Sequence, residues 1–271
     1  MIINDSTVKK YHYELFRRSR GLIERDFRKS PIKSVDWDVT QVIIPREKWP
    51  ELIASQIENE SRISDIRNMA DFGKPMESLN QGSEGYCWAY STVACTMLTK
   101  AIANQPYERL SPHAIGCKIQ NFKNRGAWGA LSMEYMSRFG CPSEEYWPQQ
   151  SMSRQWDTEE CWDDARRSMV TEGYLDISLD AWNVDLGFDM VASLLLSNIP
   201  VVLDFSWWGH SVAGMDLVEL DEDKDLDDQD RWGIRILNSW GDGWGENGTG
   251  IVAGAKAIPM GSCAARVLSG S

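Results

Sequence analysis

The chain has 271 residues, of which 42% are apolar and 25% are charged, and its formal net charge is −12. This composition supports a substantial hydrophobic core in one large domain or two small ones, and it excludes a chain that is disordered as a whole. The negative net charge argues against nucleic acid as a partner of the protein body. The sequence contains no run of eighteen apolar residues, so no membrane span is expected.

The first 60 residues begin with a basic stretch. Residues 9–33 contain nine Lys and Arg against three Asp and Glu. Residues 39–44 then predict a short strand, and residues 49–60 predict a helix with Pro50 in its first turn. We interpret residues 1–60 as an N-terminal extension, and three roles stay open for it: a structural extension packed on the body, a docking arm or an inhibitory prosegment.

The most informative segment is residues 81–91, where Gln81 precedes Cys87 by six residues and Trp88 follows directly. Glycines and a serine between Gln81 and Cys87 predict a tight turn, and residues 87–102 predict a helix. A cysteine at a helix N-terminus lies at the positive end of the helix dipole, which favours the nucleophilic thiolate. The pattern therefore indicates a reactive thiol.

The rest of the chain predicts helices first and strands afterwards. Further helices are expected at residues 110–119, 130–139 and 188–196, and strands at 199–205, 211–220, 233–237 and 248–252. The acidic insert 221–230 predicts a solvated hairpin loop rather than a calcium site, because Leu226 stands where a calcium loop needs glycine. His and Cys do not cluster at ligand spacing, so neither a metal nor another cofactor is expected.

Two later motifs complete a known pattern. His210 follows a glycine and precedes Ser211, and residues 238–241 read Asn-Ser-Trp-Gly. In this order, the Gln, Cys-Trp, His and Asn-Ser-Trp-Gly motifs resemble the papain-like cysteine peptidases, of a bacterial or phage type. The resemblance implies that residues 61–271 form an α+β fold of two lobes, one helical and one β-barrel-like, with the active-site cleft between them.

The resemblance also implies a role for each motif residue. Cys87 attacks the carbonyl carbon, and His210 takes and returns the proton. Asn238 orients the imidazole, and Gln81 donates to the oxyanion. The resemblance further implies residues of the substrate wall, the cleft lining and the support of the site: Gly126 and Ala127 for the wall, Trp208 for the lining, and Trp88 and Trp240 as supporting tryptophans.

The cysteines argue against the disulfide that secreted members of this family carry beside the nucleophile. Glu84 stands where the first cysteine of that bridge is expected, which leaves Cys117 without its partner. We expect most of the six cysteines to be reduced and buried, while a bond between Cys141 and Cys263 stays open. His113 is expected on the surface of its helix.

The sequence thus predicts thiol-dependent hydrolysis of peptide bonds in a polypeptide or in a peptidoglycan peptide. The alternative is a structural or assembly protein, for example a virion component, that keeps this fold and grips a neighbour through its basic N-terminal arm. A virion-associated peptidase would combine both. Because the N-terminus lacks the apolar stretch of a secretory signal, we expect the protein in the cytoplasm or in a virus particle.

Overall fold

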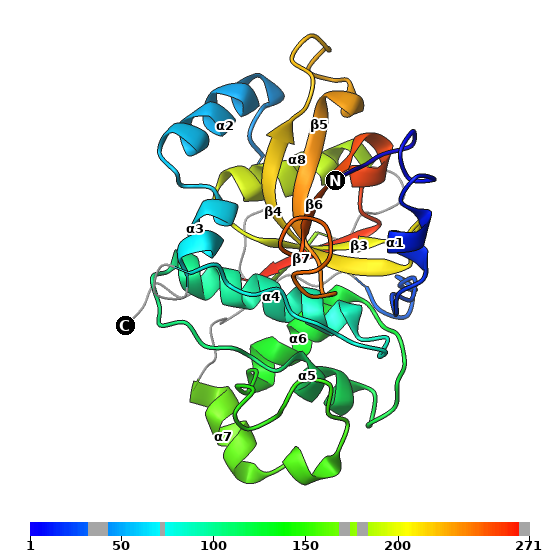
Figure 1. The fold of residues 1–271 in the computed structure, drawn as a ribbon, viewed down its shortest axis with the longest axis vertical. Coiled ribbons are helices and arrows are strands. Elements are labelled where there is room, and N and C mark those ends of the chain that lie inside the picture. Colours follow the sequence, from blue (N-terminus) through cyan, green and yellow to red (C-terminus); the bar gives the residue numbers. More distant parts are fainter. Residues whose placement is uncertain (32–42, 71–73, 168–173, 178–183, 266–271) are drawn as a thin grey trace.

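The computed structural model describes residues 1–31, 43–70, 74–167, 174–177 and 184–265. Helices α4 to α7 form one layer, and the strands with α2 and α8 form the other (Figure 1). In chain order the helices and strands are β1 (Ile2–Ile3), α1 (His12–Phe16), α2 (Trp49–Glu58), α3 (Ile63–Met69), α4 (Cys87–Ile102), α5 (Pro112–Ile119), α6 (Gly129–Phe139), α7 (Glu159–Arg167), β2 (Tyr174–Asp176), α8 (Val184–Leu196), β3 (Val201–Phe205), β4 (His210–Glu219), β5 (Trp232–Leu237), β6 (Thr249–Ala253) and β7 (Gly261–Ala265).

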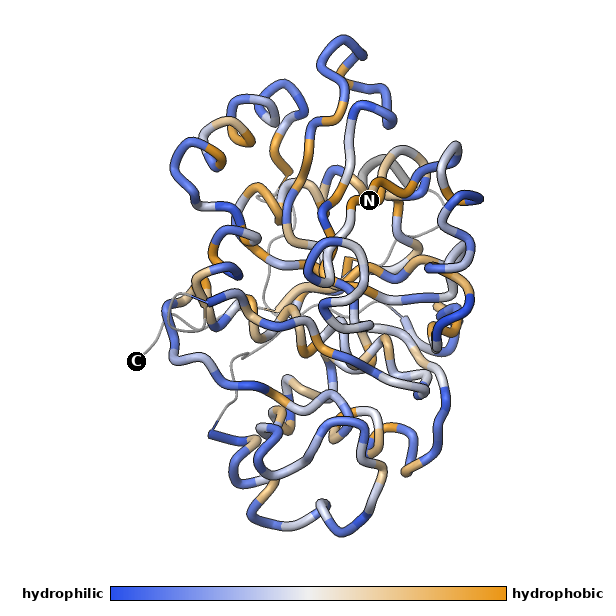
Figure 2. The backbone as a smooth tube through the Cα atoms, in the orientation of Figure 1, coloured by the Kyte–Doolittle hydropathy of each residue, from blue (hydrophilic) through white to orange (hydrophobic). Residues whose placement is uncertain are grey.

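The described strands form one seven-stranded sheet in the order β1-β6-β5-β4-β3-β7-β2. Neighbouring strands are antiparallel except for β1, which lies parallel to β6. The sheet has two edges, β1 and β2, and so does not close on itself. Apolar residues are concentrated along the strands, whereas the loop after β4 is hydrophilic (Figure 2), as predicted for the acidic insert.

Helix α4 lies between the sheet and helices α5 and α6. Every residue from Cys87 to Lys100 is buried, because the helix packs against β4 on one side and against α5 and α6 on the other. Its many Ala, Ser, Thr and Cys side chains are small enough for such close approach. One of them, Ser91, shares a hydrogen bond of 2.7 Å with Ser211 of β4, so the helix and the sheet are joined beside the site.

Most predicted elements are confirmed, with shifts of a few residues at their ends. The helices predicted from residues 49, 87, 110, 130 and 188 are α2, α4, α5, α6 and α8, and the four predicted strands are β3 to β6. Residues 39–42 of the predicted strand at 39–44 lie outside the described residues, and Ile43 and Ile44 are not in a strand. Short elements were missed: α1, α3, α7, β1, β2 and β7.

The N-terminal residues join the same core. Ile2 of β1 pairs with Ile251 of β6, and the fully buried Trp49 of α2 packs edge-on against Trp232 at 5.0 Å between ring centroids. Part of the first 60 residues therefore packs as structure on the body. The division into an extension of 1–60 and a peptidase domain of 61–271 stays a prediction.

All six cysteines are described, and all are free and buried as predicted, so the bond left open between Cys141 and Cys263 is not formed. The prediction that His113 lies on the surface of its helix was wrong. Its side chain is fully buried, and its Nδ1 shares a hydrogen bond of 2.7 Å with the Tyr90 hydroxyl. Among the described helices, none combines the length and the apolar character needed to cross a membrane.

Candidate active site

The predicted nucleophile opens the buried helix. Cys87 is the first residue of α4, and the turn before it is closed by Trp88, whose Nε1 donates to the Gly85 carbonyl at 3.0 Å. The sulfur takes a backbone hydrogen bond from Ser211. Since Ser211 directly follows His210 at the start of β4, the fold brings the Cys-Trp motif and the His motif together.

The imidazole of His210 is oriented by Asn238. Nε2 of His210 lies 2.7 Å from Oδ1 of Asn238. The same Oδ1 accepts the Ser239 backbone N–H at 2.8 Å, so it is an acceptor and Nε2 carries the proton. Nδ1 is therefore the basic nitrogen, and it is buried with no hydrogen-bond partner among the described residues.

The Asn-Ser-Trp-Gly block holds two further groups in place. The Ser239 hydroxyl donates to Oε1 of Gln81 at 2.6 Å, which leaves the Gln81 NH2 to donate to the Glu84 carbonyl at 2.7 Å and to a second acceptor. The Trp240 ring stacks on His210 at 4.4 Å, with 25° between the ring planes. One serine therefore fixes the amide, and one tryptophan covers the imidazole.

A segment of the N-terminal region crosses this site. We call residues 17–31 the strap. The Ser19 carbonyl of the strap is the second acceptor of Gln81 Nε2, at 3.2 Å. It also accepts the Trp240 indole N–H at 3.1 Å. The amide predicted to bind an oxyanion is thus occupied by a backbone oxygen.

The strap then passes over the sulfur. Gly21 gives Cys87 a backbone hydrogen bond, and the next residue, Leu22, donates its N–H to the Gly209 carbonyl at 3.2 Å. A Cβ on Gly21 would lie 1.8 Å from the Gly85 carbonyl oxygen. The strap and the turn before α4 are therefore in direct backbone contact, with no room for a methyl group between them.

The predicted substrate wall is paired with the strap. Ala127 donates its N–H to the Gly21 carbonyl at 3.0 Å, and its own carbonyl accepts the Ile23 N–H at 2.9 Å. These bonds make a short parallel bridge between Leu22 and Ala127. A Cβ on Gly126 would lie 2.3 Å from the Gly21 oxygen, so glycine is needed there. Gly126 and Ala127 thus bind an extended backbone, here the chain's own.

Trp208 lies beside the imidazole but is covered. Its ring is 4.8 Å from the His210 ring, and it is fully buried. Its Nε1 donates to the Leu15 carbonyl of α1 at 2.9 Å, while its carbonyl accepts Nη1 of Arg20 at 2.7 Å. The residue that was predicted to line the cleft therefore contacts the N-terminal region.

Burial under the strap keeps the reactive pair neutral. Burial raises the pKa of Cys87 to about 12, which outweighs the backbone hydrogen bonds to its sulfur. Burial also lowers the pKa of His210 to about 3; its hydrogen bond to Asn238 opposes this shift, and the Arg20 charge adds to it. The thiolate that the helix dipole suggested is not the favoured form while the strap is bound.

Sequence reasoning missed a buried carboxyl group behind the site. Asp204 of β3 accepts the Ser211 hydroxyl at 2.6 Å and the Gly129 backbone N–H at 2.9 Å. Burial raises its pKa to about 6. A single acidic residue inside the apolar strand at 199–205 was the available signal, because such a residue needs buried partners.

The fold is similar to that of the papain-like cysteine proteases. No family model matches the chain. The chain is similar to Zingipain-1 of Zingiber officinale, with 25% identity over 201 residues that cover 68% of this chain and 85% of the relative.

Solved structures confirm the fold. Xylellain, a cysteine protease from Xylella fastidiosa, superposes with a TM-score of 0.61 at 18% identity and covers 94% of this chain and 99% of its own. Procathepsin L2 from the larval midgut of Tenebrio molitor superposes with a TM-score of 0.59 at 18% identity, over 98% and 81% of the two chains. The predicted two-lobed class is therefore correct.

Proposed function

We propose that the chain is a thiol-dependent peptidase that uses Cys87, His210 and Asn238 as its triad and Gln81 in its oxyanion hole. The hydrogen bond of 2.7 Å between His210 and Asn238 carries this proposal, because it engages Nε2 and leaves Nδ1 of the imidazole as the nitrogen that can accept a proton. A merely structural histidine has no need of that arrangement.

The reaction follows from these atoms. Nδ1 of His210 takes the Cys87 proton, and the sulfur forms a bond to the carbonyl carbon of the substrate. The carbonyl oxygen becomes an oxyanion that accepts hydrogen bonds from Gln81 Nε2 and the Cys87 backbone N–H. The imidazolium then protonates the amine as the C–N bond breaks, and water hydrolyses the thioester with His210 as the base.

We further propose that the strap makes the intact chain latent, which is the prosegment role left open by the sequence. Gln81 Nε2 is engaged by Ser19, and Ala127 by Gly21 and Ile23. The groups that would bind the backbone of a substrate are therefore already bound to the strap.

Gly21→Ala tests both statements. The added methyl group collides with the Gly85 backbone, so the strap should leave the cleft. The measurements are casein hydrolysis and labelling by a thiol-reactive epoxide. We expect both in Gly21→Ala and neither in Glu24→Ala, a matched change at an exposed strap residue. Cys87→Ala in the Gly21→Ala background should abolish both, and hydrolysis that survives this change would end the proposal.

The nature of the natural substrate, polypeptide or peptidoglycan peptide, also belongs to this proposal. Purified peptidoglycan beside casein in the same assay distinguishes them. The alternative interpretation of the basic arm is a docking arm that binds a neighbouring protein. However, Arg18, Arg20 and Arg25 all contact the chain's own body. The virion component and the cellular location stay predictions.

A further inference from the structure

The strap carries one side chain into the interior. Nη1 of Arg25 donates to both carboxylate oxygens of Asp176 on β2, at 3.0 and 2.8 Å. The two side chains are only 6% and 1% exposed. Nε and Nη2 of Arg25 donate to carbonyls of the strap itself, Ser30 at 2.9 Å and Pro31 at 2.7 Å. The body of the protein thus supplies the carboxylate that receives this cation.

The position of the pair relative to the chemistry follows from the path of the strap. Ser19 contacts Trp240, which is stacked on the proton donor His210. The amine that leaves must lie near that imidazole, so this end of the strap covers the leaving-group side. Beyond Cys87 the strap pairs with Ala127 and then reaches Asp176. Asp176 therefore lies on the acyl side of the cleft.

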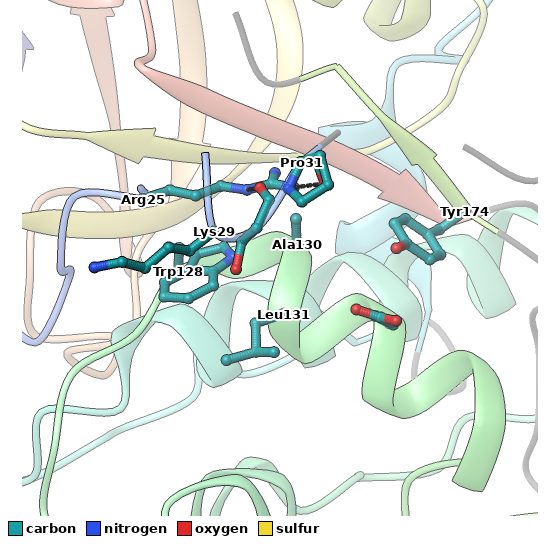
Figure 3. Close-up of a pocket in the computed structure, with 9 residues that line it drawn as sticks. Arg25, Lys29, Pro31, Trp128, Ala130, Leu131 and Tyr174 are labelled. Carbon is teal, nitrogen blue, oxygen red and sulfur yellow. Dashed lines mark hydrogen bonds between the residues drawn. The ribbon is translucent and has the colours of Figure 1, made fainter. Parts of the chain in front are cut away.

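The surroundings of the pair suit a long cationic side chain. Figure 3 shows a pocket beside it that Arg25 and Lys29 of the strap line together with Trp128, Leu131 and Tyr174. Glu134 also lines the pocket. Aromatic walls and carboxylates together bind guanidinium and ammonium groups through ring contacts and charge.

Removal of the strap takes a positive charge away from this region. Asp176 would lose its bidentate contact with the Arg25 guanidinium, and the field of Arg25 also reaches the buried Asp204. Loss of a close partner destabilises a buried ion. The opened cleft therefore offers a carboxylate to a cationic side chain at a defined place.

We propose that Asp176 is a specificity-determining residue that selects an Arg or Lys side chain on the acyl side of the scissile bond. In the closed chain, Arg25 of the strap holds the place of that side chain. This inference rests on the proposed peptidase function and names its substrate class: basic peptides. It agrees with the charge of the strap, which has six basic and two acidic residues between positions 17 and 29 in a chain of net charge −12.

The first test measures hydrolysis in the Gly21→Ala background. A set of fluorogenic peptides carries Arg, Lys, Leu or Glu at each acyl-side position. We expect kcat/KM for Arg to exceed that for Leu at least tenfold at one position. Asp176→Asn should remove this preference while the rate for Leu changes less than about threefold, and Asp176→Glu should restore most of it. An equal loss for every peptide would make Asp176 purely structural and overturn the inference.

The second test does not need catalysis. The probe is a fluorescent synthetic peptide of residues 17–31, and its partner is the Gly21→Ala/Cys87→Ala protein. The same peptide with Arg25→Leu serves as the control. Anisotropy should show at least tenfold weaker binding of the control peptide, and Asp176→Asn should make the two peptides equal.

The two tests separate the inference from the function on which it rests. Hydrolysis with no preference for Arg, together with equal binding of both peptides, overturns the role of Asp176 and leaves the peptidase intact. Absence of hydrolysis in Gly21→Ala overturns the peptidase, and the anisotropy then decides whether Asp176 binds a cation there.

Discussion

The α4 helix and the strap reach the same sulfur by different means. The first fourteen residues of α4 are buried on every side, so packing along its length fixes its position. The strap is largely without regular secondary structure and is held by separate polar contacts at Ser19, Arg20, Ala127 and Asp176. Each neutral hydrogen bond among them contributes on the order of 1 kcal/mol, whereas the buried Arg25–Asp176 pair costs more to break. The strap is therefore the part that single substitutions can release while the fold persists.

The largest effect should come from the imidazole. In the Gly21→Ala background, His210→Gln removes the general base and acid and should lower kcat about a thousandfold or more. Stopped or continuous assays of peptide hydrolysis measure kcat. Circular dichroism should show an unchanged fold, and a loss smaller than about tenfold would contradict the role of His210.

The substitution Leu98→Ala tests whether the packing of α4 and the contacts of the strap are independent. Leu98 is fully buried in α4, so its truncation should lower the free energy of unfolding by about 3 kcal/mol. Urea denaturation measures this change. Epoxide labelling of the folded intact chain should stay as low as in the wild type, because the strap contacts remain; increased labelling would show that α4 and the strap are one cooperative unit.

A smaller effect is expected from the serine that holds the oxyanion amide. Ser239→Ala removes the hydroxyl that donates to Oε1 of Gln81 at 2.6 Å. In the Gly21→Ala background we expect kcat to fall about tenfold with little change in KM, less than the hundredfold or greater loss typical of removing the donor itself. Gln81→Ala is the matched comparison, and an equal loss in both variants would contradict the ranking.

The smallest effect is expected from a change of pH, which alters the stability of the closed form. Because the closed site lowers the pKa of His210 to about 3, protonation favours the open state, so the closed form is stable above about pH 6.5 and weakens as pH falls below it. The Cys87 pKa of about 12 has the opposite sign and weakens the closed form only above about pH 9. After correction for the intrinsic pH dependence of amide exchange, hydrogen exchange of the Leu22 and Ile23 amides should therefore be slowest between these limits.

A control variant isolates the imidazole in that experiment. His210→Gln should remove the rise in exchange on the acid side. Asp204 acts in the opposite sense, because its pKa of about 6 means that the fold gains stability as this carboxyl is protonated from about pH 6 down to about pH 4. An acid-side rise that is identical in His210→Gln would assign the opening to another group.

The motif-bearing half of the structure was predictable, and the strap was not. Helices α4 to α6 and strands β3 to β6 follow from periodicity and end signals. Gln81, Cys87, His210 and Asn238 were found because each lies in a motif of defined spacing, although their roles stay part of the proposal. Leu22 and Ile23 form extended backbone against Ala127, a pairing between distant segments that no periodicity in the strap predicts.

The failures have a common physical cause. The Arg25–Asp176 pair joins residues separated by 151 positions, and a contact between an irregular segment and a three-residue strand leaves no periodic signal. The dipole argument for a thiolate at Cys87 was sound for an open helix terminus. Burial by a distant segment reversed the balance, and only the tertiary structure shows that burial.

The close approach of Gly21 to Gly85 has a genetic consequence. Every glycine codon becomes an alanine codon by one nucleotide change, and that change places a carbon 1.8 Å from a carbonyl oxygen. Dormancy in this molecule would then depend on residue 21 carrying a hydrogen atom where alanine carries a methyl group. On the proposed latency, a single base change would therefore release the cleft permanently.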